Sequence, residues 1–171
     1  MTQPNLPANL PAKRSKRVDQ VIEAGRRLGV EVVVTSFGDD GAARTAAGAA
    51  ASIGVEVDQI VKSLVFVAGE RPVLVLTAGS RRVDPAKVAA LAGGDPVSKA
   101  DADQVRAATG YAIGGTPPFG HATALPVLLD ERLTEFGEVW AAAGTPRDVF
   151  PLDPRVLVEV TGARVADVTE A

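Results

Sequence analysis

The stretch "IVKSLVFVAGERPVLVLTAG", residues 60–79, constrains the fold of this chain more than any other segment. Two runs rich in β-branched residues flank the short sequence Ala-Gly-Glu-Arg, and this arrangement predicts a β-hairpin. Strands and short helices are predicted to alternate along the rest of the chain, with further hairpins among them. The pattern therefore favours an α/β fold of the mixed α+β kind, whose sheet contains both parallel and antiparallel pairs.

Hydrophobic periodicity and capping residues predict the remaining elements. Asp84 followed by Pro85 is typical of a helix start, and Gly29 and Gly110 are typical of helix ends. Helices are expected over residues 13–28, 45–54, 84–94, 99–110 and 153–162, with a helical turn at 131–136. Strands are expected over residues 30–37, 124–130, 138–144, 148–152 and 163–168.

The length of 171 residues, with 46% hydrophobic and 23% charged residues, predicts one soluble domain over residues 12–171. Residues 1–11 are polar and rich in proline, so we expect a disordered or loosely docked tail there. No apolar run approaches the roughly 18 residues of a membrane span, and none follows the basic cluster at 13–17 as in a signal peptide. The chain has no cysteine, which excludes disulfides and thiolate chemistry and makes the cytoplasm the expected location.

The net charge of −3 argues against a protein that coats nucleic acid through charge alone, and neither DNA nor a membrane is an expected partner. Local basic patches remain at residues 13–17, 26–27 and 81–82. Each patch is either a solvated surface or a weak attractor for phosphate groups.

Lys62 interrupts an apolar face of the first strand of the hairpin. Alternation along a strand places it on one face with Ile60, Leu64 and Phe66, and places Ser63 on the other face. Such a lysine either reaches solvent at the sheet margin or projects into a cavity. In a cavity its ammonium is a donor for a carbonyl, an oxyanion or a phosphate. A Ser63–Lys62 dyad is rejected because the two side chains point in opposite directions.

The loop "YAIGGTPPFGH", residues 111–121, joins a glycine pair and a proline pair to the single histidine of the chain. Gly114 and Gly115 leave backbone N–H groups open to a ligand, and Pro117 and Pro118 stiffen the exit. The loop is either a binding loop for phosphate, carboxylate or carbonyl oxygen, or an ordinary surface turn. His121 is a candidate general base or orienting residue, with a purely structural role as the alternative.

Asp130 ends the apolar strand "LPVLLD". It is either the N-cap of the helical turn that follows or a strand-end residue at the mouth of a cleft. No metal site or cofactor is expected, because one histidine without cysteine or a paired motif offers no ligand set.

The order of several motifs resembles the YbaK/ProX family of aminoacyl-tRNA editing domains, including deacylases of Cys-tRNA(Pro) and Ala-tRNA(Pro). The resemblance covers roughly residues 20–168 and includes the segments "TAAGAAASIGVEVDQIVKSLVF", "RRVDPAKVAALAG", "TGYAIGGTPPFGH", "LPVLLDERL", "VWAAAGTPRDVF" and "LVEVTGARVADV". It implies a barrel-like mixed sheet surrounded by short helices. It also implies a trans-acting hydrolase that cleaves the ester of a mischarged tRNA, with a small amino acid and tRNA(Pro) as the expected substrate.

The resemblance also suggests which residues form the site. Lys62 matches the functional lysine of the family, residues 114–118 match its GxxxP loop, and Asp130 matches its acidic residue. Where the family often has tyrosine or histidine, this chain has Thr35, Ser36 and Phe37. The expected catalytic residues are Lys62, Gly114 and Asp130, and the expected substrate-binding residues are Ser36, Gly115, Thr116, Pro117, Pro118, Phe119, Gly120 and His121.

An aminoacyl ester is already activated, so hydrolysis needs a positioned water and donors for the carbonyl oxygen rather than a strong nucleophile. The expected partner is the 3′ end of a mischarged tRNA, bound transiently, with an aminoacyl-tRNA synthetase as a further candidate. Two alternatives stay open. One is a non-catalytic module that binds a tRNA end, a nucleotide or a synthetase, and the other is a binder of small phosphate compounds.

Overall fold

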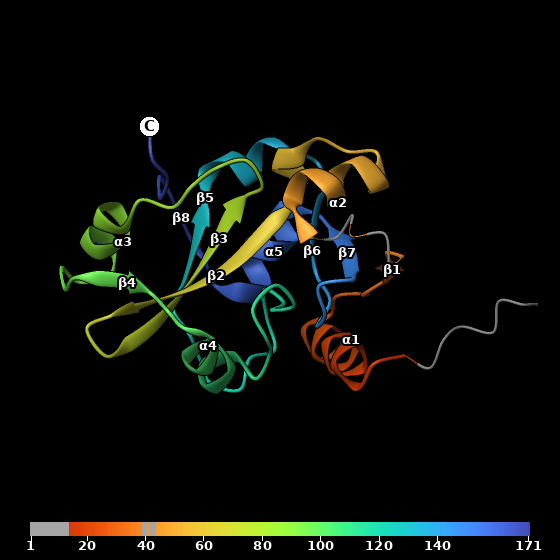
Figure 1. Ribbon diagram of the computed structural model, residues 1–171, viewed down its shortest axis with the longest axis horizontal. Helices are drawn as coiled ribbons and strands as arrows, with labels where there is room; N and C mark the ends of the chain where they lie inside the picture. The colour runs from red at the N-terminus through yellow and green to blue at the C-terminus, as the bar shows by residue number, and fades with distance from the viewer. Residues whose placement is uncertain (1–13, 39–40, 42–43) are drawn as a thin grey trace, which may run out of the picture.

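The computed structural model of the chain describes residues 14–38, 41 and 44–171, and the tail predicted at 1–11 lies outside the described residues. In the described part of the chain the strands form two sheets (Figure 1). The strands are β1 (Thr35–Ser36), β2 (Val61–Ala68), β3 (Arg71–Ala78), β4 (Val97–Lys99), β5 (Val127–Asp130), β6 (Val139–Ala142), β7 (Asp148–Leu152) and β8 (Arg164–Ala166).

The helices begin at side-chain caps and mostly end at glycines in the left-handed conformation, as the sequence predicts. Asp84, for example, accepts a hydrogen bond from the Ala86 N–H at 2.9 Å, and Gly110 has a φ of 82°. No helix in residues 14–38 and 44–171 is long and apolar enough to cross a membrane. The helices are α1 (Lys16–Leu28), α2 (Ala46–Ile53), α3 (Pro85–Leu91), α4 (Ala102–Thr109) and α5 (Pro154–Thr161), with short 3-10 helices η2 (Val57–Gln59) and η3 (Glu131–Glu135).

The larger sheet has five strands in the order β4-β2-β3-β5-β8, and the smaller sheet has three in the order β1-β7-β6. The predicted hairpin is confirmed, because β2 and β3 pair antiparallel along their full length. β3 with β5 and β5 with β8 are parallel pairs, so the sheet is mixed, as expected. A single bridge joins Ile60 to Trp140 where the two sheets meet. The sheets do not close into a true barrel.

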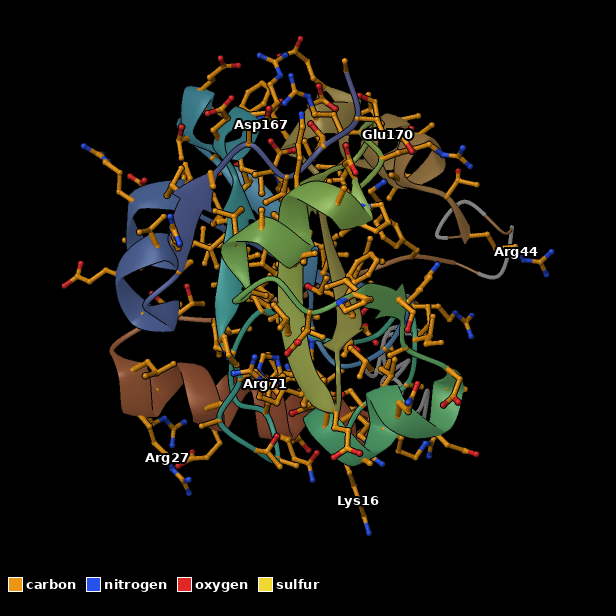
Figure 2. All side chains as sticks on the ribbon, turned by 90° about the vertical axis from the view of Figure 1, so that its left-hand side faces the viewer. Lys16, Arg27, Arg44, Arg71, Asp167 and Glu170 are labelled. Carbon is orange, nitrogen blue, oxygen red and sulfur yellow. The ribbon has the colours of Figure 1, made fainter. Side chains whose placement is uncertain are left out.

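The five-stranded sheet is covered differently on its two faces. One face packs against the smaller sheet, α1 and α5, and α3 covers part of the other face, as Figure 2 shows from the side of that helix. Fully buried side chains of the first face include Leu74, Leu76 and Leu129, together with Phe150 from β7. On the second face, Val88 of α3 packs with Phe66 and Val75.

Two elements differ from the sequence prediction. Only Thr35–Ser36 of the strand expected at 30–37 pairs with a neighbour, although Val30 and Val32 are buried in the core. The helix expected over 99–110 begins at Ala102, and the residues before it form β4, which pairs with the end of β2. A three-residue strand carries too little periodicity to be recognised before its partner is known.

Candidate functional site

A cavity of about 260 Å³ opens beside the first half of β2. β4 pairs only with residues 66–68 of this strand, so the edge at residues 62–64 has no strand partner in the described part of the chain. α2, β6, residues 113–116 and the segment after β4 surround the space. Most of the lining is apolar. The lining therefore separates a bound group from water, which strengthens hydrogen bonds to the few polar groups present.

Lys62 is half-buried and lines this cavity. Its Nζ donates a hydrogen bond of 2.5 Å to the carbonyl oxygen of Arg81. Burial and the nearby charge of Arg82 lower the pKa of Lys62, and Asp130 and Asp58 act in the opposite direction. The side chain thus lies both at the margin of the sheet and at the cavity. It offers a cation with two further N–H donors.

The glycine pair forms a tight turn at the other side of the cavity. Gly114 has a φ of 87°, and a Cβ on Gly115 would lie 2.8 Å from the carbonyl oxygen of Gly144. The Gly115 N–H donates to the Ala112 carbonyl at 3.1 Å and is therefore not open to a ligand, contrary to the sequence expectation. The N–H groups of Gly114 and Thr116 have no acceptor among the described residues. Both residues line the cavity together with Lys62.

Asp130 is fully buried and does not line the cavity. Its carboxylate accepts hydrogen bonds from the Ala78 N–H at 3.1 Å, from Arg81 Nη1 at 3.2 Å and from the Arg132 N–H at 3.0 Å. The last of these makes Asp130 the N-cap of η3, which is the first of the two readings that the sequence left open. Asp130 also binds the guanidinium of Arg81, and the carbonyl oxygen of Arg81 accepts the hydrogen bond from Lys62. Asp130 therefore helps to fix the position of the lysine.

The second half of the 111–121 loop points away from this cavity. Pro117, Pro118 and Phe119 are buried, and the Phe119 ring packs edge-to-face on Phe150 with centroids 5.7 Å apart. Nε2 of His121 lies 2.7 Å from the Pro117 carbonyl oxygen, and burial lowers the pKa of this histidine. Phe119, Gly120 and His121 line a separate groove of about 1010 Å³ beside α1. The predicted loop residues are therefore divided. Gly114 and Thr116 line the cavity, residues 118–121 line the groove, and Gly115 and Pro117 line neither.

Ser36 is also outside the cavity. Its hydroxyl donates to Asp148 at 2.5 Å, while the next residue, Phe37, lines the cavity. Sequence reasoning also missed Trp140, whose indole N–H is buried without a partner among the described residues and whose ring lines the cavity. It is the single tryptophan of the chain, and this rarity was the signal available. Lys99 and Arg44 complete the charged part of the lining.

Comparisons with known proteins identify the family of the chain. A candidate Cys-tRNA(Pro)/Cys-tRNA(Cys) deacylase of Enterococcus faecalis, EbsC, is 29% identical over 126 residues, which cover 73% of this chain and 77% of that protein. A proline–tRNA ligase of Nitratidesulfovibrio vulgaris is 36% identical over 91 residues, which cover 53% of this chain and 16% of the ligase.

Among solved structures, a candidate trans-editing enzyme for prolyl tRNA synthetase is 44% identical. It superposes with a TM-score of 0.87, and the match covers 92% of this chain and 99% of that one. The family model of the aminoacyl-tRNA editing domain matches residues 40–160, which include β2, the glycine turn and Asp130. The chain therefore belongs to the aminoacyl-tRNA editing domain family.

Proposed function

We propose that this chain is a trans-acting aminoacyl-tRNA deacylase, which hydrolyses the ester between a small amino acid and the 3′ end of a mischarged tRNA. The expected tRNA is tRNA(Pro), in keeping with the named activities of its relatives. One observation carries the proposal. Lys62 lines one largely apolar cavity together with Gly114 and Thr116, whose N–H groups have no acceptor among the described residues. Donors on two sides of a largely apolar cavity suit an ester carbonyl whose oxygen gains negative charge during the reaction.

The reaction needs only water as co-reactant. The water oxygen forms a bond to the carbonyl carbon, the bond from that carbon to the ribose oxygen breaks, and a water proton ends on the ribose oxygen. In the proposed arrangement the N–H groups of Gly114 and Thr116 hold the carbonyl oxygen, and Lys62 holds the ester or the terminal phosphate. The neighbouring ribose hydroxyl orients the water or accepts its proton, so no strong protein base is required.

Asp130 acts as a positioning residue in this scheme. It binds the guanidinium of Arg81, and the carbonyl of that residue receives the Lys62 ammonium. The buried carboxylate therefore fixes the segment against which Lys62 rests. The small volume of the cavity acts as a size filter, since one methylene group changes binding by about 1–3 kcal/mol in such a pocket.

The second candidate is a module that binds a tRNA end without hydrolysis. It is favoured by the fact that no Asp, Glu or His occurs among the described residues that line the cavity. In that case the donors that we assign to the carbonyl oxygen hold the aminoacyl group but do not activate it.

The test is deacylation of tRNA(Pro) charged with alanine, cysteine, serine or threonine, by the wild-type protein and by Lys62→Ala. We expect turnover of one of these esters, with a loss of at least tenfold in kcat/KM for Lys62→Ala. Lys16→Ala, an exposed lysine on α1, is the matched control and should retain full activity. Absence of turnover for all four esters, with the protein folded and the tRNA bound, would establish the binding module instead.

A further inference from the structure

Three cations lie near one another on adjacent segments of the chain. Lys62 and Lys99 line the cavity, and Arg82 is close enough to Lys62 to lower its pKa. Lys62 lies on β2, Lys99 ends β4 on one side of it, and Arg82 follows β3 on the other side. Lys99 is directly opposite Phe66, and Lys62 lies four residues before Phe66, so both lysines project from the same face of the sheet. At about 3.3 Å per residue, their positions are roughly 13 Å apart along the strand.

These cations have no anionic partners among the described residues. Asp130 is paired with Arg81, and Asp58 is held by Arg132 and by the hydroxyl and N–H groups of Ser80. No ion pair involves Lys62, Arg82 or Lys99 in residues 44–171. The side chains of Arg82 and Lys99 belong to exposed residues. Both charges also lower the pKa of Lys62, so the three cations repel one another in the free protein.

We propose that Lys99 and Arg82 bind phosphate groups of the RNA strand whose 3′ end enters the cavity, one on each side of Lys62. The identity of the strand rests on the proposed function. An uncompensated group of cations costs free energy in the free protein, and a polyanion that passes over the group removes this cost. The chain as a whole is acidic, with a net charge of −3, so attraction of RNA must come from a local group of this kind.

The experiment measures binding of uncharged tRNA(Pro) to Lys99→Gln, Arg82→Gln and the double variant over a series of potassium chloride concentrations. Each single change should weaken binding several-fold at low salt and reduce the slope of log affinity against log salt by about one. The double variant should reduce this slope by about two. Arg164→Gln, an exposed arginine of β8 at the opposite edge of the sheet, should bind like the wild type.

Two further measurements separate this proposal from the proposed function. If the protein is a deacylase, the variants should raise KM more than they lower kcat, because their main contacts are to phosphate groups and not to the ester. If the wild type hydrolyses no ester but its tRNA binding depends on Lys99 and Arg82, the proposed function is wrong and the phosphate contacts stand. An unchanged affinity and salt slope in the double variant would overturn the inference. Lys99→Arg and Arg82→Lys, which keep the charge, should retain most of the binding.

Discussion

Lys62 is surrounded by opposing influences that set how firmly it keeps its proton. Burial in the cavity wall and the cations Arg82 and Lys99 favour the neutral amine, whereas Asp130 and Asp58 favour the ammonium. The net direction is a lowered pKa. The Lys62 ammonium is partly shielded from water and lies near other cations. It therefore binds an incoming oxygen anion more strongly than a fully solvated lysine does.

The pKa of Lys62 should therefore respond in a predictable direction to its neighbours. We expect the midpoint of its titration, followed by the 13Cε chemical shift of labelled lysine, to lie below the ordinary value of about 10.4. Arg82→Gln should move the midpoint up, and Asp130→Asn should move it further down. Arg164→Gln serves as the control. A midpoint that Arg82→Gln leaves in place would mean that the two cations do not interact.

The sign of the linked effect on stability follows from the same shift. A lysine whose pKa is lower in the folded state destabilises the fold while it is charged in both states, at neutral pH. This cost disappears as the pH rises through the folded pKa toward the unfolded value. Lys62→Met should accordingly lose activity without losing stability at neutral pH.

Gly115 is a second residue whose surroundings determine how a substitution affects stability. A Cβ there would meet the carbonyl oxygen of Gly144 and the Cα of Thr145, both at 2.8 Å, and backbone atoms cannot move aside as a side chain does. We expect Gly115→Ala to lower the free energy of unfolding by about 1–3 kcal/mol in urea titrations. Gly137→Ala, where a Cβ has open space, should change it much less. Equal effects of the two substitutions would show that the turn tolerates a side chain.

Residue-level reasoning from the sequence succeeded where a local rule applies. Strand alternation placed Lys62 on its face of the sheet and separated it from Ser63, and the end of an apolar strand identified Asp130 as a cap or cleft residue. The same reasoning had no access to contacts over long sequence distances. The hydrogen bond that uses the Gly115 N–H, and the groove that takes His121, depend on tertiary packing.

At the level of elements, strands with strong local signals could be predicted from the sequence, whereas strands that depend on long-range pairing could not. The hairpin of β2 and β3 was predictable, because two long apolar runs lie a few residues apart. β4 was not, because it has three residues and exists through pairing with the end of β2. The strand expected at 30–37 was too long, because only Thr35 and Ser36 find a partner, in β7. The family resemblance implied one barrel-like sheet. The described residues instead form two sheets, which meet at the bridge between Ile60 and Trp140.

The start of α4 illustrates how an element holds part of the site. Asp101 accepts a hydrogen bond from the Gln104 N–H at 2.8 Å, and the Gln104 side chain accepts one from the Asp101 N–H at 2.9 Å. This capping box ends β4 just after Lys99 and begins the helix that contributes Val105 to the cavity. The cap therefore sets the relative placement of a cation and an apolar wall.

Removing this cap should destabilise the protein by a measurable amount. We expect Asp101→Ala to reduce the free energy of unfolding by about 1 kcal/mol, as is usual for loss of an N-cap carboxylate. Asp103→Ala in the same helical turn removes a charge but no cap, and it should have a smaller effect. Urea denaturation of the two variants checks the difference. Equal losses would assign the effect to the helix dipole rather than to the cap.

On the scale of the whole molecule, the cavity belongs to the junction of the two sheets. Trp140 of the smaller sheet bridges to Ile60, just before the start of β2 in the larger sheet, and its ring forms part of the wall. α2 packs small alanine side chains against the same junction. The size of the cavity thus depends on how closely the two sheets approach, and no single element determines it.

Trp140→Ala should therefore widen the range of esters that the protein accepts. We expect the ratio of kcat/KM for a large apolar aminoacyl ester to that for the best small one to rise by tenfold or more. Trp140→Phe keeps an aromatic ring and most of the bulk, although it loses the indole N–H, so it should keep most of the original preference. An unchanged ratio in Trp140→Ala would place the size filter on another wall.

The unpaired edge of β2 has a consequence for the behaviour of the protein in a crowded solution. An exposed strand edge is a template on which a second chain can add a strand and begin to aggregate. Lysines on or beside such an edge are a common protection. A second chain that paired there would bring like charges together, which opposes the pairing. Lys62 and Lys99 occupy these positions. Lys62, which we assign to the ester or the terminal phosphate, and Lys99, which we assign to an RNA phosphate, therefore also oppose the addition of a second chain. Substrate binding and resistance to aggregation thus depend on the same two lysines.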